Sequence, residues 1–181
     1  MFAKIGEFFY FIFAVFVGLF EIASSGADYS PISIEQSAAY IEEHSDTLDS
    51  LIDAMIEYGP NPETGSRSPI LSELAPNYYK DVKSKISERA RIYFEEDGVV
   101  VSFELYGGSE GFSQCELLYY EIGNPDFSAG NIYRYKSAEW DDEYGCYVIY
   151  NSANYQEIYQ LDENWFFLRE AFYDDAGFRR K

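Results

Sequence analysis

Residues 91–106 read RIYFEEDGVVVSFELY, with two β-favouring apolar runs on either side of Asp97-Gly98. An Asp-Gly pair between such runs is a strong signal for a two-residue hairpin with a type I′ turn. With that turn, Arg91 lies opposite Glu104, and two apolar pairs form, Phe94 with Val101 and Ile92 with Phe103. We therefore predict that this hairpin begins an antiparallel sheet.

The sequence after the hairpin continues as short apolar runs separated by turn residues, up to residue 173. Their regular spacing predicts a β-meander of about six to seven strands that is strongly curved or partly closed. The last run, from Trp165, is apolar on both faces through Leu168, so we expect both of its faces to be covered. Residues 174–181 form a polar tail.

Two amphipathic helical patterns precede the sheet, within residues 31–90. Ser33 and Gln36 have the spacing of a capping box, and apolar residues then recur every three or four positions. A second helix, rich in lysine, is expected over residues 77–89. These patterns predict a single α+β domain over residues 28–173, with its two helices packed on the antiparallel sheet.

The amino-terminal residues 1–27 have the layout of an export signal. Lys4 precedes an uncharged apolar run at residues 8–20, and the small residues at 25–27 suit a signal peptidase. Residues 5–23, counted instead as one stretch, are nearly long enough to span a membrane. The segment is therefore a signal peptide or an N-terminal membrane anchor, and the domain is predicted to be secreted or membrane-anchored, outside the cytoplasm.

The composition restricts the partners of this domain. Aspartate and glutamate total 32 against 13 lysines and arginines, a formal net charge of −19. Such a surface repels phosphate backbones, so we predict no nucleic-acid binding. A hydrophobic fraction of 47% and an aromatic fraction of 19% predict a packed acidic domain rather than a disordered one.

The sequence contains no recognisable catalytic or metal-binding motif. His44 is the sole histidine, which rules out multi-histidine metal patterns, and neither a nucleophile elbow nor a phosphate-binding loop occurs. We therefore predict no metal and no cofactor. A pair of carboxylates for glycoside hydrolysis has no local spacing rule, so a carboxylate-dependent extracytoplasmic hydrolase remains an alternative.

We predict a non-catalytic binding module that presents an aromatic-rich β-sheet to a protein or glycan partner. Tyrosine and tryptophan favour both strands and interfaces. A further alternative is a small-ligand carrier with a pocket in the curved sheet. The candidate binding residues are Tyr133, Arg134, Tyr135, Lys136, Trp140 and Tyr147.

Cys115 and Cys146 form a candidate disulfide. An oxidising, exported environment favours the bond. In a plain meander, however, the two residues begin the third and fifth strands, about 9.6 Å apart, which exceeds the usual Cα separation in a disulfide. The sequence therefore leaves a disulfide and two free thiols as alternatives.

Overall fold

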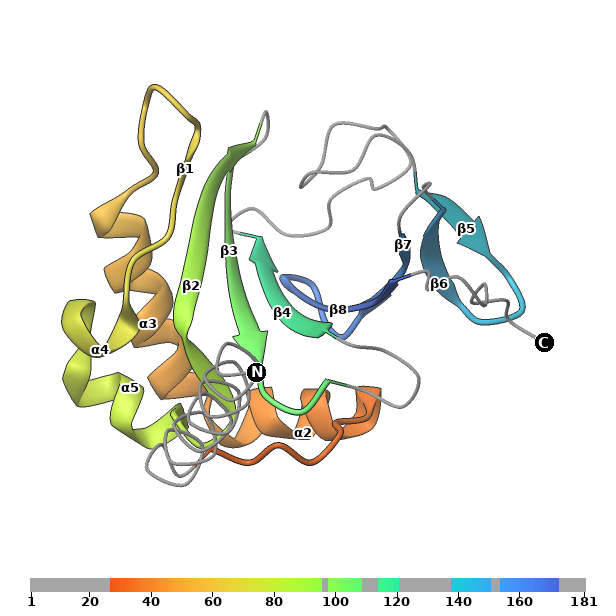
Figure 1. Cartoon of the computed structure of the whole chain (residues 1–181), viewed down its shortest axis with the longest axis horizontal. Helices are drawn as coiled ribbons and strands as arrows, with labels where there is room; N and C mark the ends of the chain where they lie inside the picture. The colour runs from red at the N-terminus through yellow and green to blue at the C-terminus, as the bar shows by residue number, and fades with distance from the viewer. Residues whose placement is uncertain (1–26, 96–97, 109–113, 121–137, 151–153, 173–181) are drawn as a thin grey trace, which may run out of the picture.

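The computed structural model describes residues 27–95, 98–108, 114–120, 138–150 and 154–172. Within these ranges the chain forms four helices and one antiparallel sheet of eight strands, which confirms the α+β class. The helices lie toward one end of the sheet, and the opposite end extends away from them (Figure 1). None of the helices in these ranges has the length and apolar character needed to cross a bilayer. Residues 5–23 lie outside the described residues.

The sheet consists of two antiparallel runs of four strands that meet side by side. In the described residues the order is β1-β2-β3-β4-β8-β7-β6-β5, so β8 pairs with β4 and the sheet is open. The predicted meander of about six to seven strands is therefore wrong in strand order and in number. The strands are β1 (Ser66–Arg67), β2 (Ile86–Glu95), β3 (Gly98–Leu105), β4 (Gln114–Tyr120), β5 (Glu139–Asp141), β6 (Cys146–Tyr150), β7 (Asn154–Gln160) and β8 (Trp165–Phe172).

Strands β2 and β3 form the predicted hairpin in a different register. Arg91 lies opposite Ser102 instead of Glu104, and Glu95 lies opposite Gly98. The shift is two residues, and a shift of two leaves every side chain on its original face because side chains alternate along a strand. The hydrophobic pattern therefore predicts the faces correctly but does not distinguish between these two registers.

The helices also differ in extent from the prediction. Ser33 caps α2 through a capping box with Gln36, as predicted, but the amphipathic pattern that starts there is divided at His44 between α2 and α3. The second predicted helix ends at Val82, and strand pairing already begins at Ile86, because pairing with β3 overrides local helix propensity. The helices are α2 (Ile34–Glu43), α3 (Ser45–Tyr58), α4 (Leu71–Leu74) and α5 (Pro76–Val82).

Buried side chains cover both faces of the central strands. On the helix side, Leu48 and Met55 of α3 belong to the same hydrophobic cluster as Phe103 and Phe167 of the sheet. On the other side, a second cluster includes Val100, Leu118, Phe166 and Leu168. Strand β8 is therefore buried on both faces along its first half, as predicted from its composition.

Residues 28–32, which we call the strap, are fastened to the start of β2. The Lys85 ammonium donates to the Ser30 carbonyl oxygen at 2.8 Å and to the Asp28 carboxylate at 3.2 Å. Hydrogen bonds from Ser30, and then the Lys85 contact, lower the pKa of Asp28 to about 2. The strap is thus a part of the folded domain.

A glycine lets the strap lie directly on the end of β3. Gly107 has φ +87°, and a Cβ at this position would lie 2.6 Å from the Tyr29 carbonyl oxygen. The neighbouring Gly108 carbonyl accepts a hydrogen bond from the Ile32 N–H at 3.0 Å. Both the backbone conformation and the close approach therefore require a glycine at residue 107.

Candidate functional site

Trp140 and Tyr147 are the two predicted binding residues that the structure describes, and they contact each other. They are direct cross-strand partners on β5 and β6, with ring centroids 5.0 Å apart in an edge-to-face arrangement. Trp140 is 53% exposed, an unusually large exposure for a tryptophan. The other four predicted residues, at 133–136, lie outside the described residues.

Residues 139–150, which we call the aromatic–acidic hairpin, are shaped by their turn. The Asp141 carboxylate accepts hydrogen bonds from the Glu143 and Tyr144 N–H groups at 3.0 and 3.1 Å. The Asp141 carbonyl accepts from the Gly145 N–H at 2.8 Å, and Gly145 supplies a φ of +62°. These local bonds fix the turn that joins the two strands.

Acidic residues flank the exposed tryptophan in the sequence. Residues 139–143 read EWDDE, so four carboxylates accompany Trp140 within this short segment. The Asp142 carboxylate accepts a hydrogen bond from the Trp140 indole N–H at 2.9 Å. The indole is therefore held by a hydrogen bond to Asp142 and a ring contact with Tyr147, while about half of its surface faces solvent.

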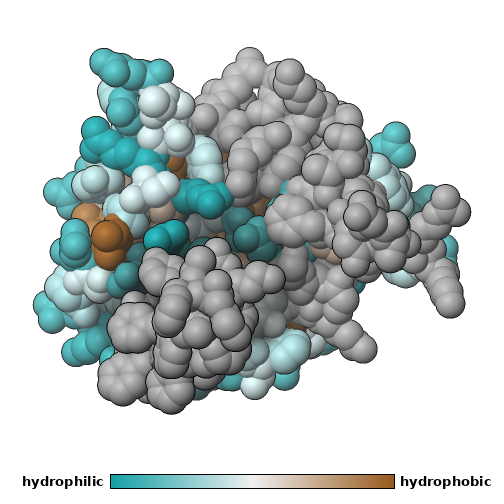
Figure 2. All heavy atoms as spheres, in the orientation of Figure 1, coloured by the Kyte–Doolittle hydropathy of each residue, from teal (hydrophilic) through white to brown (hydrophobic). Residues whose placement is uncertain are grey.

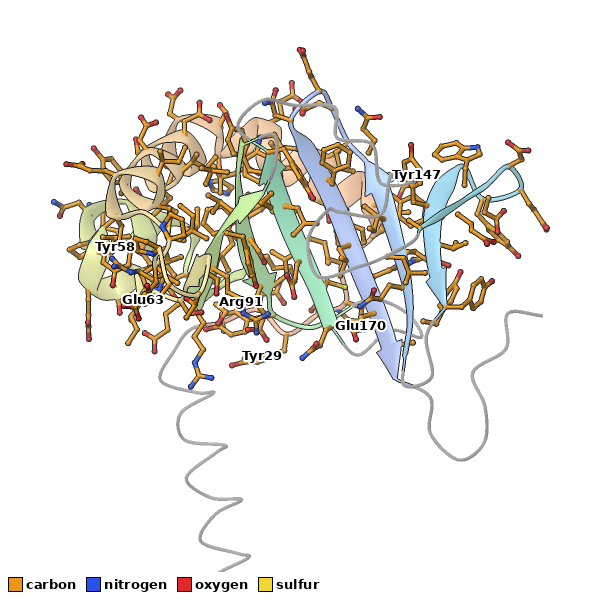
Figure 3. All side chains as sticks on the ribbon, turned by 90° about the horizontal axis from the view of Figure 1, so that it is seen from above. Tyr29, Tyr58, Glu63, Arg91, Tyr147 and Glu170 are labelled. Carbon is orange, nitrogen blue, oxygen red and sulfur yellow. The ribbon has the colours of Figure 1, made fainter. Side chains whose placement is uncertain are left out.

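A second exposed aromatic side chain lies on the opposite face of the hairpin. Tyr150 is 62% exposed and packs against Tyr155 of β7 with ring centroids 5.0 Å apart. The structure places Tyr147 at the end of the sheet away from Tyr58 of α3 (Figure 3). The aromatic–acidic hairpin therefore projects beyond the helices and exposes aromatic rings on both of its faces.

Sequence analysis missed a buried polar cluster centred on Glu157. This fully buried carboxylate accepts hydrogen bonds from the Tyr155 hydroxyl at 2.6 Å, the Tyr159 hydroxyl at 2.8 Å and the Arg169 guanidinium at 2.6 Å. Burial, and then the contact with Glu157, raise the pKa of Tyr159. The alternating pattern Tyr155-x-Glu157-x-Tyr159 places all three side chains on one face, and this was the available sequence signal.

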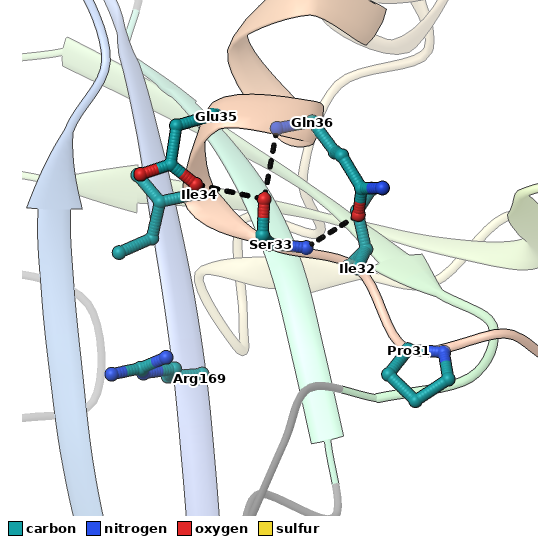
Figure 4. A pocket seen from close by; sticks show the side chains of 7 residues that line it. All are labelled: Pro31, Ile32, Ser33, Ile34, Glu35, Gln36 and Arg169. Atoms are coloured by element: carbon teal, nitrogen blue, oxygen red, sulfur yellow. Dashed lines mark hydrogen bonds between the residues drawn. The ribbon is translucent and has the colours of Figure 1, made fainter.

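Arg169 also lines a pocket of about 290 Å³ beside the start of α2 (Figure 4). The polar groups at this helix start are engaged with each other: the Ser33 hydroxyl accepts from the Gln36 N–H and donates to the Glu35 carboxylate. The charged residues that line the pocket are one anion, Glu35, and one cation, Arg169. The Glu157 cluster is therefore a buried, hydrogen-bonded ion pair, and Arg169 connects it to a polar pocket.

Two further buried glutamates, Glu116 and Glu170, lie on the opposite face of the sheet from Glu157. Glu116 accepts a hydrogen bond from Ser102, and each glutamate is 6% exposed. The strand register places Glu116 and Glu170 diagonally on β4 and β8. Both side chains are therefore almost inaccessible to solvent.

The two cysteines are free thiols in the structure, and the candidate disulfide is not formed. Cys115 lies on β4 and Cys146 on β6, with β8 and β7 between them. Three strand spacings are about 14 Å, well beyond disulfide reach. Burial raises the pKa of the Cys115 thiol to about 12, so this thiol is unreactive at neutral pH.

The comparisons assign no family to the chain: no protein-family model, no curated protein and no solved structure matches it. Within the part of the chain that the structure describes, no group of three or more histidine, cysteine, aspartate or glutamate side chains is placed to hold a metal ion. The candidate site therefore depends on the geometry of the aromatic–acidic hairpin alone.

Proposed function

We propose that this chain is an exported, non-catalytic binding module that uses the aromatic–acidic hairpin to contact a protein or glycan partner. The observation that carries this proposal is Trp140, which is 53% exposed and yet held in place by Asp142 and Tyr147. A fixed aromatic ring loses little conformational entropy when it binds, and tryptophan is enriched among the residues that dominate interfaces.

The charge of the surface indicates what kind of partner fits. The hairpin carries four carboxylates within residues 139–143, and hydrophilic side chains predominate over the described residues on the face shown in Figure 2. Complementary charge steers association and selects against wrong partners. A partner that presents positive charge is therefore favoured, and export through residues 1–27 would place the domain where it meets such partners.

Site-specific photocrosslinking in the native cells tests this proposal. A photoreactive phenylalanine derivative replaces Trp140 in the full chain, and a matched variant carries it at Tyr58, which is 43% exposed at the other end of the sheet. We expect a discrete crosslinked product from position 140 and none from position 58. No product at 140, or the same products at both positions, would refute the proposed function.

Turnover assays distinguish the alternative hydrolase. The full chain, solubilised in a non-ionic detergent, is incubated with glycans and peptides. If the chain is a binding module, we expect no turnover. An activity that disappears on Glu116→Gln or Glu170→Gln substitution would replace the binding proposal with a catalytic one.

A further inference from the structure

The outer edge of β5 is the most specific binding feature of the aromatic–acidic hairpin. β5 is the last strand in the sheet order, paired with β6 on one side, and the described residues place no strand on its other side. Every second residue of a terminal strand directs its N–H and C=O groups away from the sheet. Such an edge is a template for another extended segment.

The opposite edge of the sheet lacks these properties. β1 has only the two residues Ser66 and Arg67, and Pro69 follows shortly after. The Arg67 guanidinium lies 5.0 Å from the centre of the Tyr58 ring and donates to the Tyr58 carbonyl oxygen. The β1 edge therefore carries a cation that is engaged with Tyr58, whereas the three-residue β5 edge has alternating acidic and aromatic side chains.

The side chains of β5 separate by chemistry between the two faces of the sheet. Glu139 and Asp141 lie opposite Val148 and Cys146 on one face, and Trp140 projects from the other. A strand added at this edge would place alternate side chains beside the two carboxylates and the remaining ones beside the indole ring. The edge therefore fits a segment in which basic residues alternate with apolar ones.

Charge distinguishes between two segments that could pair with this edge, one from a second copy of this chain and one from a basic partner. A second copy of this chain would bring the same carboxylates together, in a molecule that already carries a net charge of −19. Like charges directly across a strand pair are destabilising, and acidic edge residues protect against self-pairing in this way. The same residues attract a basic strand.

We propose that the outer edge of β5 binds an extended, lysine- or arginine-rich segment of a partner protein as an added β-strand. The partner's cations lie beside Glu139 and Asp141, and its apolar side chains lie against Trp140. This inference rests on the proposed function, because it names the partner class and the binding mode of the same hairpin.

The test uses a dye-labelled peptide of alternating lysine and valine, with fluorescence anisotropy measured on the full chain in detergent micelles. Its first control is the same peptide with alternate backbone nitrogens methylated, which preserves charge and side chains but removes strand hydrogen bonds. The second control alternates glutamate and valine. We expect methylation to weaken binding about tenfold or more through several lost hydrogen bonds, and the acidic peptide not to bind.

Matched variants of the chain test the location. Glu139→Lys reverses a charge beside the edge, and Glu63→Lys makes the same change in net charge in the exposed loop before β1. We expect Glu139→Lys to lower the affinity for the lysine–valine peptide several-fold. Glu63→Lys should change that affinity little. Circular dichroism is used to check that both variants are folded.

Equal binding of the methylated peptide, or equal effects of the two variants, would overturn strand addition and leave only charge-driven adsorption. If the photocrosslink at position 140 forms while either of these results holds, the proposed function stands and the strand-addition inference fails. If no crosslink forms at position 140, the proposed function itself fails. The two proposals are therefore separated by their own readouts.

Discussion

At the scale of single residues, Glu157 is the polar side chain whose loss should be most destabilising. Its carboxylate is fully buried and receives the Arg169 guanidinium at 2.6 Å, and the side chain of Arg169 is itself 19% exposed. Removing one partner of a buried ion pair leaves the other charge uncompensated. We predict that Glu157→Gln lowers the free energy of unfolding by about 3 kcal/mol in urea titrations.

Two comparisons isolate the cause of this effect. Glu163→Gln removes an exposed carboxylate from the turn before β8 and should change stability by less than about 0.5 kcal/mol. The double variant Glu157→Gln with Arg169→Met removes both charges and should recover a part of the lost stability. A double variant whose loss equals the sum of the two single losses would contradict a coupled ion pair.

At the scale of secondary-structure elements, the strap tests whether close backbone packing is needed for stability. Gly107 and Gly65 have similar positive φ values, +87° and +68°, but only Gly107 has backbone atoms where a Cβ would stand. We predict that Gly65→Ala costs about 1 kcal/mol, the backbone strain alone, and that Gly107→Ala costs at least about twice as much. Urea unfolding of the two variants measures the difference, and equal losses would show that the strap moves freely aside.

The elements of this fold differ in how far the sequence predicts them. The start of α2 is predicted because Ser33 and Gln36 form a local motif, and the faces of β2 and β3 are predicted because alternation is local. The register of that hairpin and the pairing of β4 with β8 depend on contacts between distant segments, which no local pattern encodes.

The residues of the candidate site likewise divide into those that a local pattern predicts and those that depend on contacts between distant segments. The sequence indicates Trp140 and Tyr147 as binding residues because strand aromatics favour interfaces, and the structure brings them into contact. The Glu157 cluster was missed because its partner Arg169 is on another strand, and thirty-two acidic residues gave no reason to select one of them. Its recognition required the pairing of β7 with β8.

At the scale of the whole molecule, the two ends of the sheet should differ in local stability. Strands β3, β4 and β8 are central and buried on both faces, whereas β5 is a three-residue edge strand beyond the helices. We predict that native-state hydrogen exchange is slowest in β3, β4 and β8 and fastest, through local opening, in β5 and its partner β6.

Two variants test this gradient. Phe167→Ala removes a fully buried ring from the helix-side core and should lower the free energy of unfolding by about 3–5 kcal/mol, with faster exchange throughout the sheet. Trp140→Ala removes a mostly exposed ring and should accelerate exchange only in β5 and β6. Mass-spectrometric exchange profiles measure both effects. A binding surface can be changed without destabilising the neighbouring strands. If Trp140→Ala also accelerated exchange in β4 and β8, the aromatic–acidic hairpin would therefore be a structural part of the core.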